Sequence, residues 1–198
     1  MRITDLLDKR SISLDAAPAD KKATLDMAVE LMAKSGKLLD VEQYRAQVYA
    51  REEESTTGIG EGIAIPHGKC DAVKTPGLAA MVIKNGVDYD SLDGEPVTLL
   101  FLIAAPNTKD NVHLDVLSKL SVMLMDENFT ASLRNAKSVE EFLQIIDAAD
   151  ESAKSIDDRL NDTGITTEEK KSFKLLAVTS CPTGIAHTYM AAEALEKA

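Results

Sequence analysis

His67 has the surroundings that best suit chemistry in this chain. It follows Pro66 inside the stretch Gly58–Cys70, which contains four glycines. Glycine lets backbone N–H groups approach a small ligand closely, and proline fixes the chain just before the histidine. We therefore expect a loop, rather than the middle of a helix or strand, to present the imidazole as a nucleophile or a metal ligand.

Several other residues could complete a phosphate site around His67. His113 falls in the first turn of an expected helix, where N–H groups and the helix dipole favour an anion. Arg51 stands near the end of another expected helix and could hold phosphate oxygens with its guanidinium fork. The hydroxyl of Thr57 and the backbone at Gly68 are further candidate phosphate ligands. The alternatives are a polar helix-start residue for His113 and an ion pair with neighbouring glutamates for Arg51.

Cys70 suggests a different chemistry, because it lies three residues after His67. A zinc site with His113 as the third ligand is the alternative that these residues leave open. A lone H-x-x-C lacks the paired spacing of structural zinc sites. We therefore expect no metal and no cofactor.

Cys181 opens a second loop with reactive potential. It follows the apolar stretch 174–180 and precedes the Ala-rich helical stretch 188–198. Backbone N–H groups and a helix start in this setting stabilise a thiolate and hold a phosphate, so Cys181 is a candidate nucleophile. The alternative is a buried, unreactive cysteine. The candidate phosphate ligands of this loop are Thr183, Gly184, His187 and Thr188.

Helical and strand-like stretches alternate through residues 1–150, which indicates an α/β fold. Residues 3–14 are expected to form a short helix or turn and then an edge strand. A helix is expected over 21–35, with Asp20 as its N-cap, and a second after Asp40, ending in three solvated glutamates at 52–54.

Two apolar runs, 78–83 and 97–104, predict strands, and the second is expected to be central in the sheet. Asn85-Gly86 predicts a turn after the first of them. A helix is expected over 112–125, and a last one after the capping box formed by Ser138 and Glu141.

Composition changes after this last helix. Apolar residues become sparse over 151–171, which predicts an acidic linker between domains. A strand, a loop and a partial helix cannot bury a core alone, so 172–198 are expected to be the first part of a second domain.

The overall charge and cysteine usage narrow the class of protein. The formal net charge of -11 argues against a nucleic-acid partner. No apolar run approaches the ~20 residues of a membrane span, and no secretory leader follows Met1, so a cytoplasmic location is expected. Cys70 and Cys181 are expected to be free thiols.

Two motifs resemble a known family. The run 60–68 (GEGIAIPHG), with Asn111-Val112-His113-Leu114 further on, resembles the enzyme IIA domain of the fructose and mannitol class of the bacterial phosphoenolpyruvate-dependent sugar phosphotransferase system. The run 180–196 (SCPTGIAHTYMAAEALE) resembles the start of the fructose-type enzyme IIB domain.

The resemblance implies a fold and a function. Residues 1–150 would form a three-layer α/β/α domain around a small mixed sheet. His67 would accept a phosphoryl group from the phosphocarrier protein HPr, with Arg51 and His113 stabilising it. Cys181 would take the group next and pass it to fructose or a similar sugar, imported by a membrane-embedded IIC domain of the same permease. A regulatory, nitrogen-type IIA module is the alternative function.

Overall fold

The computed structural model describes residues 2–108 and 112–162, with only the backbone given for 112–115 and 152–162. Its chain falls into two units, Met1–Asp157 and Asp158–Ala198. The sheet belongs to the first unit with the helices that pack on it, except that the last of these helices continues to Asp162. No helix of the described residues has both the length and the apolar character needed to cross a bilayer.

The first unit has a mixed sheet of six strands in the order β1-β5-β6-β3-β2, with β4 also paired to β6. Pairing is parallel between β1 and β5 and between β6 and both β3 and β4, and antiparallel between β5 and β6 and between β2 and β3. The strands are β1 (Leu7–Ser13), β2 (Gly58–Gly60), β3 (Ile63–Ala64), β4 (His67–Cys70), β5 (Gly77–Val87) and β6 (Val97–Pro106).

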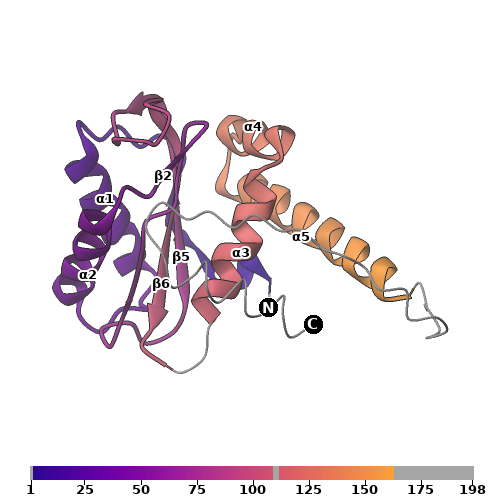
Figure 1. The fold of residues 1–198 in the computed structure, drawn as a ribbon, viewed down its shortest axis with the longest axis horizontal. Helices are drawn as coiled ribbons and strands as arrows, with labels where there is room; N and C mark the ends of the chain where they lie inside the picture. Colours follow the sequence, from indigo (N-terminus) through magenta and orange to yellow (C-terminus); the bar gives the residue numbers. More distant parts are fainter. Residues whose placement is uncertain (1, 109–111, 163–198) are drawn as a thin grey trace, which may run out of the picture. The chain divides into compact units, whose positions relative to one another are not determined.

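Helices cover both faces of this sheet, as Figure 1 shows, so the predicted three-layer α/β/α fold is confirmed. One face carries α1 (Lys21–Lys34) and α2 (Val41–Glu54). The other carries α3 (Val112–Leu124), α4 (Glu127–Asn135) and α5 (Val139–Asp162). A 3₁₀ turn, η1 (Ile3–Asp5), precedes the edge strand β1, as expected.

Burial on both faces explains the near-continuous apolar runs of β5 and β6. Along β6, Leu100 and Leu102 enter the cluster beneath α1 and α2, whereas Phe101 and Ile103 enter the cluster beneath α3 to α5. This alternation follows the two-residue period of a strand. The predicted central strand is therefore confirmed, and it separates two apolar cores.

The sequence predicted most helix starts correctly. The Asp20 carboxylate accepts a hydrogen bond from Ala23 N, and the Asp40 carboxylate accepts one from Gln43 N. At α5, the Ser138 hydroxyl accepts from Glu141 N, and the Glu141 carboxylate accepts from Lys137 N. The side chains at these positions satisfy N–H groups that lack partners within the helix.

The expected turn at Asn85-Gly86 needs correction, and one helix was missed. Asn85-Gly86 is not a turn between strands, since β5 continues to Val87 through an irregularity in its pairing with β6. Gly86 has a φ of +66°, and a Cβ there would lie 2.9 Å from Pro96 Cβ. The missed helix α4 begins after Asp126, whose carboxylate accepts from Asn128 N and Phe129 N.

The predicted linker 151–171 begins as helix, because α5 runs through Asp162. The first part of α5 is tied to the N-terminus of the chain. The buried Asp150 carboxylate accepts a hydrogen bond from Ile3 N at 3.0 Å and pairs with Lys119. Residues 163–171 of the predicted linker, and the predicted domain start at 172–198, lie outside the described residues.

Asp26 joins α1 to α2 and makes stability depend on pH. Its carboxylate accepts hydrogen bonds from Lys22 Nζ (2.8 Å), Tyr49 OH (2.9 Å) and Arg45 Nη1 (2.5 Å). The bond from Lys22, with smaller contributions from Tyr49 and Arg45, lowers the pKa of Asp26 from its ordinary 3.8 to about 2. The charged carboxylate therefore stabilises the fold above the unfolded-state pKa, and this contribution is lost as pH falls from about 4 towards 2.

We predict that Asp26→Asn lowers the free energy of unfolding at pH 7 by about 1–2 kcal/mol, because the charged acceptor is lost. The difference from the unsubstituted chain should shrink at pH 3, where the carboxylate begins to protonate on unfolding. Urea denaturation at the two pH values measures both quantities. Asp71→Asn, at an exposed aspartate, is the control and should change neither. An equal loss at both pH values would contradict this account.

Candidate functional site

Arg51 and His67 meet at the end of helix α2. Arg51 Nε donates a hydrogen bond to His67 Nε2 at 3.1 Å. Arg51 Nη1 is held by the Ser55 carbonyl oxygen at 3.0 Å and the Ser55 hydroxyl at 3.3 Å. The structure therefore brings together two of the predicted site residues. Arg51 contacts His67 and Ser55 here, and it does not form the alternative ion pair with the neighbouring glutamates.

The other imidazole nitrogen faces the backbone. His67 Nδ1 lies 3.0 Å from the Ile65 carbonyl oxygen. That oxygen can only accept, and the Arg51 Nε–H group can only donate, so both contacts are satisfied when Nδ1 carries the proton. The geometry thus favours the tautomer in which Nε2 holds a lone pair and points at a cation.

His67 is placed by strand pairing rather than by a loop, which corrects the expectation from sequence. It is the first residue of β4 and stands opposite Ile103 of β6. The carbonyl oxygen of the preceding Pro66 accepts a hydrogen bond from Ile103 N at 3.0 Å. The imidazole therefore starts from a strand that pairs directly with the central strand β6, which is among the most buried parts of the domain.

Gly68 brings α2 close to β4. A Cβ at Gly68 would lie 3.0 Å from Tyr44 Cε2 and 3.2 Å from Val48 Cγ2, both on the buried face of α2. Tyr44 OH also donates to the Ile103 carbonyl oxygen at 2.9 Å. Because Arg51 follows Val48 by about one helical turn, this close packing carries its guanidinium to His67. Gly68 has this packing role in the structure, and its predicted contact with phosphate stays a prediction.

Glu52 fixes the end of α2 to the segment that follows it. Its carboxylate accepts from Thr57 N at 2.9 Å and from the Thr57 hydroxyl at 2.5 Å, and it pairs with Lys21 Nζ at 2.8 Å. Tyr89 OH lies 3.4 Å from the same carboxylate, and burial raises the pKa of Tyr89, which keeps its proton. Four groups thus converge on one buried carboxylate beside Arg51.

This arrangement corrects the expectation for Glu52, which is 8% exposed rather than a solvated end of the helix. Helical spacing was the signal that could have revealed it, because Glu52 follows Val48 by four residues on the buried face that also holds Tyr44. The Thr57 hydroxyl is directed at Glu52. A contact of Thr57 with phosphate therefore remains only a prediction.

Cys70 lies apart from His67 in the structure. The two residues are three apart on β4, so their side chains leave opposite faces of the strand. Cys70 is packed in the core beneath α1 and α2, and burial raises the pKa of its thiol. Among the described residues, no group of three His, Cys, Asp or Glu side chains is placed to hold a metal ion.

The remaining predicted site residues fall at or beyond the limits of the structure. His113 lies in the first turn of α3, as predicted, and only its backbone is described. Because β6 leads into α3, His113 starts from the same end of the sheet as His67. Cys181, Thr183, Gly184, His187 and Thr188 lie outside the described residues.

We predict that Glu52→Gln lowers the free energy of unfolding by about 1–3 kcal/mol, since it removes a charged, buried hydrogen-bond acceptor. Hydrogen exchange at the Thr57 amide should become faster, because that N–H donates directly to the carboxylate. Glu53→Gln, at the exposed neighbouring glutamate, is the matched control and should leave both measurements unchanged. Equal behaviour of the two variants would show that the Glu52 carboxylate does not hold this segment.

Comparison with curated proteins finds longer relatives, one of which has a region similar to the whole of this chain. It is 44% identical over 197 residues to the fructose-specific EIIABC component of the phosphotransferase system (PTS) of Bacillus subtilis, covering 100% of this chain and 31% of that protein. The chain therefore spans about a third of the length of this relative.

Solved structures of IIA proteins match almost three quarters of the chain. The nitrogen regulatory protein IIA-Ntr of Neisseria meningitidis is 33% identical with a TM-score of 0.68, covering 73% of this chain and 98% of that one. The complex of enzyme IIA and phosphorylated enzyme IIB for mannitol from Escherichia coli contains a chain that is 28% identical, with a TM-score of 0.63. That match covers 72% of this chain and 99% of the other.

Two family models match successive parts of the sequence. Residues 176–198 match the model described as the lactose/cellobiose-specific IIB subunit of the PTS. Residues 5–149, most of the chain, match the model described as the phosphoenolpyruvate-dependent sugar phosphotransferase system, EIIA 2. The sheet that positions His67 and the helix that carries Arg51 lie within this longer match, and the chain belongs to the EIIA 2 family of the phosphoenolpyruvate-dependent sugar phosphotransferase system.

Proposed function

We propose that this chain is a phosphoryl carrier in sugar uptake. His67 accepts a phosphoryl group from the phosphocarrier protein HPr and passes it to Cys181 of the IIB segment, for phosphorylation of fructose or a fructose-like sugar. The observation that carries this proposal is the imidazole held between the Arg51 guanidinium and the Ile65 carbonyl oxygen. Similarity to the fructose-specific relative and to a IIB model supports the choice of pathway.

Each contact of His67 has a role in the proposed transfer. With Nδ1 protonated towards Ile65, the lone pair on Nε2 attacks phosphorus, forming the Nε2–P bond while the bond to the donor breaks. The proton on Nδ1 stays on the ring throughout. The ring therefore carries a positive charge beside the phosphoryl group, and the Ile65 carbonyl oxygen stabilises it.

Arg51 supplies the positive charge for the phosphoryl oxygens. Its Nε–H group, bonded to Nε2 in the free protein, turns to an oxygen of the arriving group, while the Ser55 contacts keep the guanidinium in place. Transfer of this kind depends on positioning and on neutralising the negative charge. We propose that His113, which starts from the same end of the sheet, adds to this stabilisation.

We predict that His67→Ala abolishes the acid-labile phosphoryl label acquired from phosphoenolpyruvate, enzyme I and HPr. Arg51→Gln should lower the labelling rate about 100-fold, the scale for removing one preorganised charge or donor. Arg51→Lys, which keeps the charge but loses the fork, should label at a rate between those of Arg51→Gln and the unsubstituted chain. Arg45→Gln, at an arginine on the same helix that pairs with Asp26, is the control and should label normally.

Labelling of His67→Ala at the normal rate would overturn the assignment of the acceptor. Equal rates for Arg51→Gln and Arg45→Gln would leave His67 as acceptor but remove the proposed role of Arg51.

A regulatory module of the nitrogen type is the second candidate, because the IIA-Ntr structure matches almost its whole length to this fold. The match of residues 176–198 to a IIB model favours the sugar pathway instead. Label that moves from His67 to a fructose-type IIB cysteine and then to sugar in the presence of IIC membranes would support the carrier. Stable label on His67 under these conditions would support the regulatory module.

A further inference from the structure

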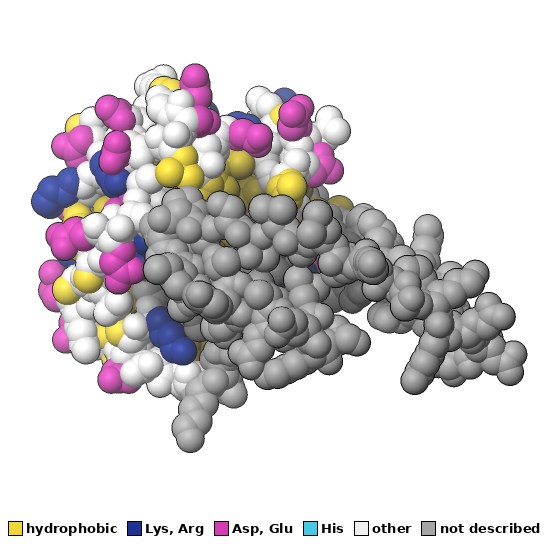
Figure 2. All heavy atoms as spheres, in the orientation of Figure 1, with side chains coloured by type: hydrophobic (Ala, Val, Ile, Leu, Met, Phe, Trp, Pro, Cys, Tyr) yellow, Lys and Arg dark blue, Asp and Glu magenta, His cyan; other side chains and the backbone are white. Residues whose placement is uncertain are grey.

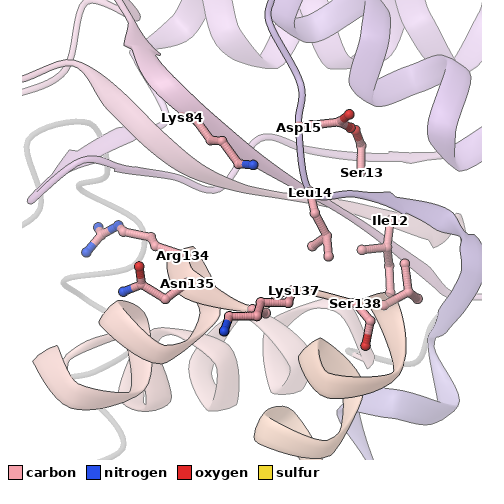
Figure 3. Close-up of a pocket in the computed structure, with 11 residues that line it drawn as sticks. Ile12, Ser13, Leu14, Asp15, Lys84, Arg134, Asn135, Lys137 and Ser138 are labelled. Carbon is pink, nitrogen blue, oxygen red and sulfur yellow. The ribbon is translucent and has the colours of Figure 1, made fainter.

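A second candidate site lies in a cleft at the β1 edge of the sheet. The cleft has a volume of about 710 Å³ and lies between the end of β1, Lys84 of β5 and the junction of α4 with α5 (Figure 3). Its lining is Ile12, Ser13, Leu14, Asp15, Lys84, Arg134, Asn135, Ala136, Lys137, Ser138 and Val139.

Three basic side chains from separate segments line this cleft: Lys84, Arg134 and Lys137. Figure 3 shows Lys84 extending from the sheet above, and Arg134 and Lys137 standing on the helical side below. The only acidic residue in the lining is Asp15, whose carboxylate lies beside Ser13, on the opposite side of the view from Arg134 and Lys137. The lining therefore carries a net positive charge.

This cluster stands out because the chain as a whole is acidic, with a formal net charge of -11. Figure 2 shows acidic side chains spread over the part of this face that is coloured by residue type. Several basic side chains elsewhere are paired with carboxylates, as Lys9 is with Glu140 and Arg45 with Asp26. Within the described part of the chain, none of the three basic residues of the cleft has such an ion pair.

The cleft also has apolar side chains in its lining. They are those of Ile12, Leu14, Ala136 and Val139. Arg134 is braced by neutral oxygens, donating to Thr98 Oγ1 at 2.9 Å and to the Glu61 carbonyl oxygen at 2.7 Å. Lys84 and Lys137 are exposed and extend from the two opposite walls. A ligand that matches this lining carries negative charge on a small organic body.

We propose that this cleft binds a small organic anion, with a phosphate or carboxylate group held by Lys84 and Lys137 and a carbon body against the apolar side chains of the lining. The cleft is distinct from the His67 site. Arg134 contacts Thr98 near the start of β6, whereas His67 pairs with Ile103 near the other end of that strand. The proposal does not depend on phosphoryl transfer by His67.

Arg134 links the cleft to the chain that leads to His67. The Glu61 carbonyl oxygen that it binds belongs to the tight turn between β2 and β3, where Glu61 has a φ of +55° and Gly62 a φ of +71°. A Cβ at Gly62 would lie 3.4 Å from Arg134 Nη2. An anion that attracts the guanidinium would therefore change the surroundings of this turn, which gives the test a second reporter.

The test is an NMR titration of the full ¹⁵N-labelled chain with glycerol 2-phosphate, citrate and, for ionic strength, sodium chloride. Amide signals of Ser13, Asn135 and Lys137 should shift and saturate with a millimolar or lower dissociation constant for at least one organic anion. Signals of Glu61 and Gly62 should shift with the same constant. A response to glycerol 2-phosphate alone identifies phosphate as the recognised group, a response to citrate alone identifies carboxylate, and both support the proposal.

The double variant Lys84→Glu/Lys137→Glu should weaken binding at least tenfold. Lys34→Glu/Lys74→Glu makes the same charge change at exposed lysines outside the cleft and should bind normally. Equal affinity of the two double variants, the same shifts with sodium chloride, or no saturation by either organic anion would overturn the proposal. Labelling of His67 by phospho-HPr, measured on the same variants, reports separately on the proposed function.

Discussion

The contact between Arg51 and His67 depends on how closely helix α2 packs against strand β4. Gly68 permits that approach, because any side chain there would enter the space of Tyr44 and Val48. Tyr44 then reaches past β4 to the backbone of the central strand at Ile103, the residue that pairs with His67. One helix–strand contact therefore sets the distance between the cation and the imidazole.

The buried carboxylate of Glu52 fixes the end of helix α2 that carries Arg51. A charge this deeply buried costs free energy unless it is paired and hydrogen-bonded, and Lys21, Thr57 and Tyr89 meet that need. These partners come from α1, from the chain after α2 and from the chain after β5. The same carboxylate thus gathers three separate segments around the residue next to Arg51. The contacts of the Glu52 carboxylate therefore both stabilise the fold and fix the position of the Arg51 guanidinium.

Local signals predicted much of this fold correctly. The aspartates at 20 and 40 cap helices because a side-chain oxygen can satisfy nearby N–H groups without help from distant segments. The run 97–104 was predicted as a central strand because only a strand covered on both faces is apolar at nearly every position. Arg51 was placed near His67 from its position at the end of a helix that precedes the glycine-rich stretch.

The remaining features depend on tertiary partners. Glu52 looks like one of three solvated glutamates until Lys21 and Tyr89 are brought to it. Asn85-Gly86 has the composition of a turn, but β6 continues to pair beyond it at Val87. His67 looks like a loop residue because four glycines surround it, although pairing with β6 makes it the start of a strand. In each case a contact between distant segments overrides a local preference.

The central claim is that the Ile65 carbonyl oxygen and Arg51 together make Nε2 the nucleophilic nitrogen of His67. Long-range ¹H–¹⁵N NMR of the imidazole, before and after incubation with phospho-HPr, tests it most directly. The account predicts a proton on Nδ1 of the free protein and phosphorus bonded to Nε2 after transfer. A free imidazole protonated on Nε2, or a phosphoryl group bonded to Nδ1, would contradict it.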